Sequence, residues 1–262
     1  MQLLQSRVAL VTGGGRGIGR GAALALAGLG AAVAVVARST GEVAAVAGEI
    51  AAQGGRAVAL SVDVADWGEV EAAAAEIERE LGPIDILINN AAILGPLEPT
   101  ATSDPAEWAR AIEINVVGAY HCLRAVLPGM LDRGWGRIVN VSSGAAKGSG
   151  ILNASAYSTS KAALDMLTHA VAAEVAASGV TVNAVYPGIV DTAMQNQIRA
   201  APVERIGAAT SERFHGFYER GELQDASAPG RLIAALVASD LHGEIVSNSN
   251  ARAAELLRLL AS

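Results

Sequence analysis

Residues 8–19 read VALVTGGGRGIG, an apolar run that passes directly into five glycines. The run predicts a buried strand over Val8–Thr12, and the residues from about Ile18 to Leu29 predict a helix. Glycine has no Cβ, so it lets the chain turn tightly between the two elements. A strand that enters a helix through so short a turn is typical of the first unit of a parallel α/β sheet.

The same alternation of strand and helix continues along the chain. The expected strands are apolar throughout, which is typical of a parallel sheet covered on both faces. We therefore predict an α/β, doubly wound Rossmann fold, with residues 1–262 as one domain. Further strands are expected at Ala32–Val36, Ala57–Val62, Ile84–Asn89, Arg137–Val141, Val180–Val185 and Glu244–Ser247, and further helices at Glu42–Gln53, Glu69–Leu81, Glu107–Leu131, Ala156–Ala177 and Arg231–Ala238. Pro128-Gly129 is expected to break the helix over Glu107–Leu131 near its end.

Composition and charge exclude several other classes of protein. Hydrophobic residues make up 52% and charged residues 17% of the chain, which is enough apolar material for a large core. The net charge is −7 and no basic run occurs, so nucleic acid is not an expected partner. Cys122 is the only cysteine and the first residues show no signal-peptide pattern, so we expect a cytoplasmic protein. The uncharged stretch Gly21–Ala37 is expected to form a helix end, a turn and a strand, not a membrane span.

The glycine cluster also predicts a ligand. Gly13, Gly17 and Gly19 are spaced G-x3-G-x-G. Such a turn lets a pyrophosphate approach the backbone closely, where the free N–H groups of a helix N-terminus bind it. We therefore predict a dinucleotide site, although the cluster alone leaves a flexible loop without a ligand as the alternative.

The end of the second strand indicates which dinucleotide binds. An NAD site usually places an Asp or Glu there, as an acceptor for the ribose 2′-hydroxyl. Here the strand runs into Arg38, and no acid appears until Glu42. Arg38, together with Arg16 of the glycine turn, is expected to bind the 2′-phosphate of NADP(H). If both arginines are only solvated, NAD(H) is the alternative. Asp63, after the third strand, is either an acceptor for the adenine amino group or a turn residue.

Together with later motifs, these residues resemble the short-chain dehydrogenase/reductase family, in its single-domain branch that includes 3-oxoacyl-ACP reductases. The resemblance covers about Arg7–Thr192. The matching motifs are Thr12-Gly13-x3-Gly17-x-Gly19, Asp63-Val64, Asn89-Asn90-Ala91-Ala92, Ile114-Asn115-Val116, Ser142-Ser143, Tyr157-x3-Lys161 and Pro187-Gly188-Ile189-Val190-Asp191-Thr192.

This resemblance implies a seven-stranded parallel sheet with helices on both faces and a reaction that transfers hydride at a carbonyl carbon. Two features depart from the family pattern. Ala92 stands where the family usually has glycine, and the C-terminus, with an apolar helical pattern over Ala253–Leu260, lacks the frequent Val-Asp-Gly-Gly-like ending. The implied cofactor-binding residues are Gly13, Gly15, Arg16, Gly17, Ile18, Gly19, Arg38, Asp63, Val64, Asn90, Ala91, Tyr157, Lys161, Pro187, Gly188, Val190 and Thr192.

Tyr157 and Lys161 are four residues apart in a predicted helix, so they share one face. Tyrosine has a pKa of about 10 and is a poor base at neutral pH, so a nearby ammonium is expected to stabilise its phenolate and lower that pKa. The alternative is a surface pair of no chemical role. Lys147 and Lys161 are the only lysines among 19 basic residues, which favours a specific use of lysine at this place.

Ser143 ends the fifth strand, where its hydroxyl is expected to bind the substrate oxygen. Ser142 is expected to point the other way. We assign the second serine because the family's catalytic serine is the second of such a pair. Asn115 lies in a predicted helix although Asn is a poor helix former. By the resemblance it holds a water that links Lys161 to solvent; alternatively it satisfies a neighbouring backbone group.

These residues predict an oxidoreductase that transfers hydride between NADP(H) and a carbonyl or secondary alcohol, with Tyr157 as proton donor and acceptor. A non-catalytic nucleotide-binding or sensing protein and an NAD-dependent alcohol dehydrogenase are the alternatives. An epimerase or dehydratase of this fold would need a further substrate domain. The histidines are widely scattered, so no metal site is expected.

Three segments are expected to select a small-molecule substrate: Ile93–Thr100, Ala145–Ser155 and a lid over residues 193–225. The lid contains Phe214 and Phe217, which indicates either an apolar substrate or a helix that packs its own apolar face. The two long helices over about 107–131 and 156–177 are rich in Ala and Leu, and we expect them to pair in a homodimer or homotetramer. No membrane association is expected.

Overall fold

The computed structural model describes residues 3–148 and 150–260. Its centre is one sheet of seven parallel strands in the order β3-β2-β1-β4-β5-β6-β7. The strands are β1 Val8–Thr12, β2 Ala32–Ala37, β3 Ala57–Ser61, β4 Ile84–Asn89, β5 Gly136–Val141, β6 Val180–Tyr186 and β7 Ile245–Ser247. The order reverses between β1 and β4, and both neighbours of β1 run parallel to it. This confirms the predicted doubly wound Rossmann fold.

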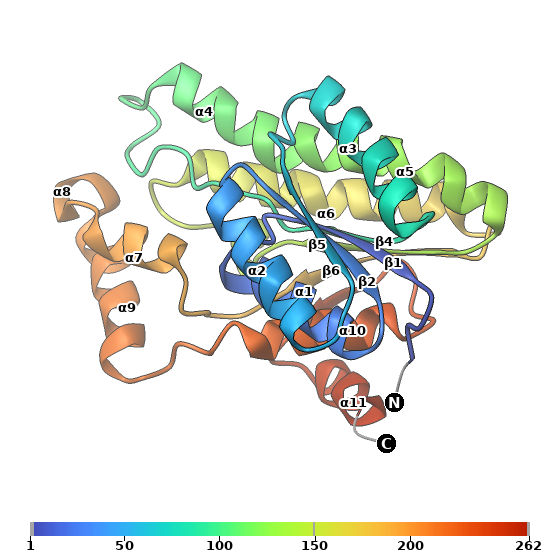
Figure 1. The fold of residues 1–262 in the computed structure, drawn as a ribbon. Helices are drawn as coiled ribbons and strands as arrows, with labels where there is room; N and C mark the ends of the chain where they lie inside the picture. The colour runs from blue at the N-terminus through green and yellow to red at the C-terminus, as the bar shows by residue number, and fades with distance from the viewer. Residues whose placement is uncertain (1–2, 149, 261–262) are drawn as a thin grey trace.

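Helices cover both faces of the sheet, as Figure 1 shows. On one face lie α1 Gly17–Gly28, α2 Thr40–Ala52, α10 Ser227–Val237 and α11 Ala251–Leu259. On the other lie α3 Trp67–Leu81, α5 Gly118–Arg133 and α6 Ser155–Val175. Every residue of β1 is buried, because the side chains of a parallel strand enter a core on both sides. This accounts for the lack of alternation in the strand sequences.

The predicted helix over Glu107–Leu131 is interrupted, but not where we expected. A π-helical turn over Glu113–Val117 separates α4 Pro105–Ile112 from α5. The break predicted at Pro128-Gly129 is wrong: α5 continues through Pro128 to Arg133 and ends at Gly134 in the left-handed conformation, with φ of 63°. Proline removes one N–H donor from a helix, and the packing of Val126 and Met130 in the core holds the turns on either side.

One helical stretch among the described residues, Pro105–Arg133, is long and apolar enough by composition to cross a membrane. Within its most apolar window, 44% is buried inside the fold. Leu123, Val126 and Met130 of this stretch pack into the core between the sheet and the helices α3 and α6, which accounts for the apolar character of the stretch. The other apolar stretch, Gly21–Ala37, is divided between α1 and β2 as predicted.

The predicted irregular segment over residues 193–225 contains three helices: α7 Ala193–Ala200, α8 Val203–Ile206 and α9 Ala208–Glu219. They project from one side of the sheet, beyond the end of β6 (Figure 1). A parallel bridge between Val190 and Gln224 ties the two ends of the segment together. The apolar pattern over Ala253–Leu260 forms α11, which packs Ala253 and Leu256 into the core beside α10.

Candidate active site

A cleft of about 720 Å³ lies at the carboxyl ends of the strands, where β1 and β4 part. Ligands of open α/β sheets bind at this switch point, because the loops diverge there and helix N-termini face the gap. Most of the predicted cofactor residues line the cleft. They are Gly13, Gly15, Arg16, Gly17, Ile18, Arg38, Asp63, Val64, Asn90, Ala91, Tyr157, Lys161, Pro187 and Thr192.

The glycine turn is fixed by contacts with the end of β4. The Thr12 hydroxyl accepts hydrogen bonds from the N–H groups of Asn90 and Ala91, at 3.0 and 3.1 Å. The Asn90 amide donates back to the carbonyls of Thr12 and Gly13, at 2.9 and 3.1 Å. Gly13 has φ of +61°, and a Cβ there would lie 2.8 Å from the Asn90 amide. Thr12 and Gly13 therefore allow the glycine turn to pack against the segment Asn90-Ala91 after β4.

The N-terminus of α1 is a suitable anion site. No side chain caps it, and its first turn contains no acidic residue. No side chain therefore accepts a hydrogen bond from its first N–H groups, and the helix dipole adds partial positive charge at the same point. Gly17 opens the helix with φ of +52°, a conformation that L side chains rarely adopt. This donor set fits the pyrophosphate of a dinucleotide.

Arg16 and Arg38 both line the cleft, as the prediction of a 2′-phosphate site requires. Arg16 is not free, however: its Nη1 lies 3.5 Å from a carboxylate oxygen of Glu42. Glu42 lies in the first turn of α2, and Ser39 caps that helix by accepting from the Glu42 N–H at 3.4 Å. The fold thus places an acid, Glu42, beside Arg16, although the sequence at the end of β2 contains no acid.

Asp63 behaves as a turn residue in the structure. Its carboxylate accepts from the Ala65 N–H at 3.0 Å and forms an ion pair with Arg110 of α4. Arg110 also contacts Glu113 at 3.2 Å. Asp63 nevertheless lines the cleft, so the structure is compatible with the predicted contact to adenine as well.

Tyr157 and Lys161 lie on the inner face of α6, and both side chains are buried. The Lys161 Nζ lies 5.6 Å from the centre of the Tyr157 ring and donates to the Val141 carbonyl at 2.8 Å. The alternative of a surface pair is therefore wrong. Burial lowers the pKa of Lys161 to about 8, and the charge of Asp165 opposes this shift.

The expected lowering of the Tyr157 pKa is not found in the protein's own groups. Burial raises the pKa of Tyr157, and a hydrogen bond with the Ser143 hydroxyl only partly opposes the shift. Desolvation destabilises the phenolate by more than Ser143 stabilises it. Tyr157 is therefore protonated at neutral pH, as a proton donor must be.

Ser143 follows β5 and is extended, with its hydroxyl accepting from the Ala145 N–H at 3.2 Å. Ser142, which was expected to point the other way, also contacts α6: it donates to the Lys161 carbonyl at 3.3 Å and lines the cleft. Ser143 lowers the pKa of the Tyr157 phenol, against the larger effect of burial, so the Ser143 side chain lies near the phenol. That Ser143 contacts a substrate oxygen stays a prediction, since Ser143 itself does not line the cleft.

Asn115 lies in the π-helical turn and is 1% exposed. Its amide pairs with the Ile93 backbone, accepting from the N–H and donating to the carbonyl, both at 2.8 Å. It also donates to the Ser160 hydroxyl at 2.9 Å. The alternative that Asn115 satisfies a backbone group is confirmed. The hydrogen-bonding groups of the Asn115 side chain are thus all paired within the protein, and the water that links Lys161 to solvent stays a prediction.

Apolar residues from the three predicted substrate segments meet around Tyr157. Leu94 and Leu97 come from the first segment, Ala145 and Ala154 from the second. The lid adds a further set, which consists of Ile198, Ile206 and Phe214 with the partly buried Met194, Ala201 and Phe217. Of this cluster only Tyr157 and Met194 line the cleft, so the other apolar side chains pack the segment over residues 193–225 against the rest of the fold beside the phenol.

Some residues differ from the prediction. Five predicted residues are not part of the cleft wall: Gly19, Asn115, Ser143, Gly188 and Val190. Gly19 has a packing role instead, since a Cβ there would lie 2.2 Å from the Gly13 carbonyl oxygen. Ser39 and Glu42 line the cleft without having been predicted, whereas Ile93, Met194, Asn196 and Gln197, which also line it, lie in the predicted substrate segments. Ser39 and Glu42 were detectable, because Ser-x-x-Glu is the sequence pattern of a helix cap.

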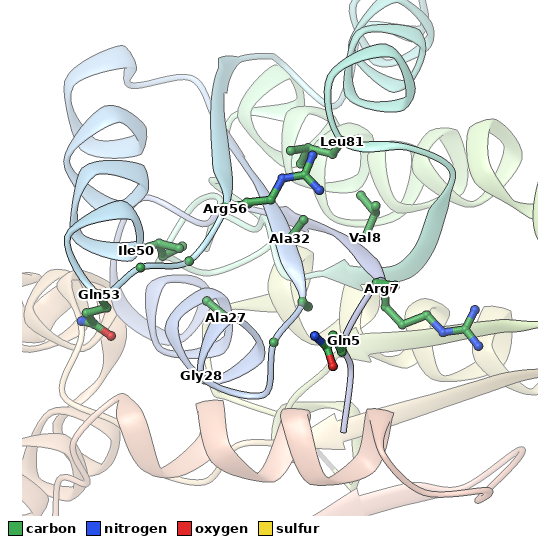
Figure 2. A pocket seen from close by; sticks show the side chains of 15 residues that line it. Gln5, Arg7, Val8, Ala27, Gly28, Ala32, Ile50, Gln53, Arg56 and Leu81 are labelled. Carbon is green, nitrogen blue, oxygen red and sulfur yellow. The ribbon is translucent and has the colours of Figure 1, made fainter. Parts of the chain in front are cut away.

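A second cavity, of about 460 Å³, lies at the opposite edge of the sheet (Figure 2). Arg56 lines it and donates to the Glu80 carbonyl near the end of α3 at 3.3 Å. Arg56 thus satisfies a carbonyl that the helix end leaves free. The cavity is far from Tyr157, at the amino ends of the strands. Among the residues that the structure describes, no group of three or more metal-ligating side chains is found.

Comparison with known proteins agrees with this site. A model of the short chain dehydrogenase family matches residues 7–202. The 3-oxoacyl-[acyl-carrier-protein] reductase of Synechocystis sp. is 39% identical over 78% of this chain and 82% of its own length.

Two solved structures have the same fold. An actinorhodin polyketide ketoreductase with NADPH superposes with a TM-score of 0.84 at 34% identity, covering 92% of this chain and 95% of its own. An NAD⁺-bound xylitol dehydrogenase superposes with a TM-score of 0.83 at 30% identity, covering 93% of this chain and 98% of its own. The chain therefore belongs to the short-chain dehydrogenase family, whose members are oxidoreductases that bind a nicotinamide cofactor.

Proposed function

We propose that this chain is an NADP(H)-dependent ketone reductase and secondary-alcohol dehydrogenase. The observation that carries the proposal is the buried Tyr157–Lys161 pair beside Ser143, with both residues of the pair in the wall of the cleft. Burying an ammonium costs several kcal/mol, so a lysine without a chemical role is expected to stay at the surface. Lys161 is buried, which favours a chemical role.

When bound, NADPH would supply a hydride to the carbonyl carbon of the substrate. Tyr157 donates its phenolic proton to the carbonyl oxygen, so that the product is the alcohol. Ser143 donates a hydrogen bond to the same oxygen and orients it. Lys161 stabilises the phenolate that remains, until a proton reaches it from solvent through a water near Asn115. Asn115 also positions Ser160, whose hydroxyl donates to the Tyr157 carbonyl at 2.7 Å.

Preference for NADP(H) is supported by Arg16 and Arg38 in the cleft and by the absence of an acid at the end of β2. A charge-assisted hydrogen bond to a phosphate contributes about 1.5–3 kcal/mol, which is roughly ten- to a hundredfold in affinity. Similar structures include one with NADPH and one with NAD⁺, so both alternatives occur on this fold.

The substrate of the proposal is a small carbonyl compound with an apolar body, held under the lid over residues 193–225. Ile93, Ile114 and Met194 in the cleft wall support it, and so do relatives named as reductases of 3-oxoacyl or ketoacyl groups and a similar structure named as a polyketide ketoreductase. The single domain over residues 1–262 acts in the cytoplasm, without nucleic-acid or membrane partners.

We also propose a homodimer or homotetramer. Four apolar side chains are exposed on one helical face of the sheet. They are Val117 in the π-helical turn, Tyr120 and Leu131 in α5, and Met166 in α6. Exposed apolar side chains on neighbouring helices suit a symmetric contact with a second copy. Sedimentation as a monomer at micromolar concentration would contradict this.

The experiment compares Tyr157→Phe with Tyr120→Phe, which removes the hydroxyl of a tyrosine that is 52% exposed on α5. Oxidation of NADPH is followed with ketones, aldehydes and 3-oxoacyl thioesters. Tyr157→Phe should reduce turnover at least about 100-fold, while NADPH fluorescence shows unchanged binding. Tyr120→Phe should act like the wild type. Tight NADPH binding without turnover by the wild type would favour the non-catalytic alternative.

A further inference from the structure

We propose that Glu42 limits the discrimination between NADP(H) and NAD(H), because its carboxylate competes with the 2′-phosphate for Arg16. This inference rests on the proposed cofactor site and adds a residue that opposes the phosphate there. The cofactor preference would then be set by three side chains of the cleft wall, two of them cationic and one anionic.

The geometry places Glu42 inside the site. Its carboxylate lies 3.5 Å from the Arg16 guanidinium, and both residues line the same cleft as Arg38. The Glu42 side chain is 40% exposed, so the carboxylate is available to the cleft. An anion that enters between the two arginines meets a negative charge already paired with one of them.

The local structure explains why Glu42 is held there. In a helix cap of the Ser-x-x-Glu pattern, the glutamate usually reaches back to the N–H of the capping residue. Here Ser39 accepts from the Glu42 N–H at 3.4 Å, while the carboxylate of Glu42 turns to Arg16 instead. A Cβ on Gly15 would lie only 2.8 Å from the Glu42 Cβ. Gly15 therefore lets the glycine turn pack directly against the first turn of α2.

The electrostatic consequence differs between the two cofactors. A phosphate monoester carries between one and two negative charges at neutral pH, so NADP(H) must either displace Glu42 from Arg16 or remain close to its carboxylate. NAD(H) brings no such charge, and the Arg16–Glu42 pair can persist. Because the pair faces solvent, its effect is expected to be a few-fold, not orders of magnitude.

The chain offers a matched control on the same helix. Glu49 of α2 also pairs with an arginine, at 2.6 Å from Arg20, but neither of these two residues lines the cleft. Glu42→Gln and Glu49→Gln each remove one carboxylate and one ion pair from α2. Glutamine is also accepted at the Glu42 position of a helix cap, so the fold of α2 is preserved.

The test measures the affinities of NADP⁺ and NAD⁺ by isothermal titration calorimetry, without a substrate. Glu42→Gln should raise the ratio of NADP⁺ to NAD⁺ affinity by roughly fivefold, and Glu49→Gln should leave the ratio within twofold of the wild type. In an Arg16→Gln background, Glu42→Gln should lose most of this effect, since the cation for which the two anions compete is gone.

An unchanged ratio in Glu42→Gln would overturn the inference, and so would an equal rise in Glu49→Gln or a full effect in the Arg16→Gln background. The outcome is separate from that of the proposed function. A wild type that binds NAD⁺ more tightly would contradict the cofactor proposal, whereas the role of Glu42 depends only on the change between wild type and variant.

Discussion

The glycine turn and the lid close the same cleft from two sides, but different interactions hold them. At the glycine turn, backbone approaches backbone: a Cβ on Gly19 would lie 2.2 Å from the Gly13 carbonyl oxygen. The lid is attached through a small apolar cluster and through an ion pair between Arg205 and Glu98 whose arginine is 51% exposed. The turn has no room to move, whereas the segment over residues 193–225 is held by side-chain contacts alone at these two places.

This comparison predicts its largest effect at the glycine turn. Gly19→Ala should destabilise the protein by about 3 kcal/mol, because the new methyl group meets backbone that cannot shift without moving β4 as well. Gly28→Ala is the control: it lies on the same helix and a Cβ there would meet nothing within 4 Å. It should be neutral or slightly stabilising. Urea unfolding of both variants measures the difference, and equal midpoints would contradict the account of the turn.

The sequence predicted the glycine turn well because its constraint is local. Gly13, Gly17 and Gly19 lie between an apolar strand and a predicted helix, and this position favours a tight turn over a flexible loop. The alternation of strands and helices along the chain and the position of Tyr157 and Lys161 on one helix face followed from patterns of the same kind. Ser143 was assigned only through the family resemblance, since a serine at a strand end has many other uses.

The parts that were missed depend on contacts between distant segments. The contact between Glu42 and Arg16 requires the first turn of α2 to pack against the glycine turn, and neither sequence indicates that the two segments meet. The π-helical turn around Asn115 arises where its amide reaches the Ile93 backbone, 22 residues away. The opposite shift of the Tyr157 pKa follows from burial by the lid and two other segments. Pattern and propensity cannot show these contacts.

Lys161 provides the second prediction, at the floor of the cleft where both sides meet. Its pKa of about 8 in the folded protein lies below the usual value of 10.5, so the unfolded chain binds more protons between these pH values. Stability should therefore rise with pH from about 8 toward 10. Lys161→Met should remove this rise and stabilise the protein at pH 7 by about 2 kcal/mol, after allowing for the lost bond to Val141.

Lys147→Met is the control, because Lys147 is the only other lysine and is exposed. It should leave the pH dependence of the free energy of unfolding unchanged. Urea unfolding at pH 7 and at pH 9.5 gives both values. If Lys161→Met is less stable than the wild type at pH 7, the buried ammonium is paired better than its surroundings indicate, and the cost of burying it has been overestimated.

The smallest effect is expected at the lid. Arg205→Gln removes the 2.8 Å ion pair with Glu98, a partly exposed contact that contributes about 0.2–1 kcal/mol. The free energy of global unfolding should change little, because the sheet core does not depend on this contact. Chymotrypsin should instead cleave the lid up to about fivefold faster at Phe214, Phe217 or Tyr218, since the lid opens more often.

Arg252→Gln, which removes the exposed pair with Glu255 on α11, should leave that rate unchanged. If Arg205→Gln destabilised the whole protein and left the cleavage rate unchanged, the lid would be as firmly built as the glycine turn, and the contrast between the two sides of the cleft would be wrong.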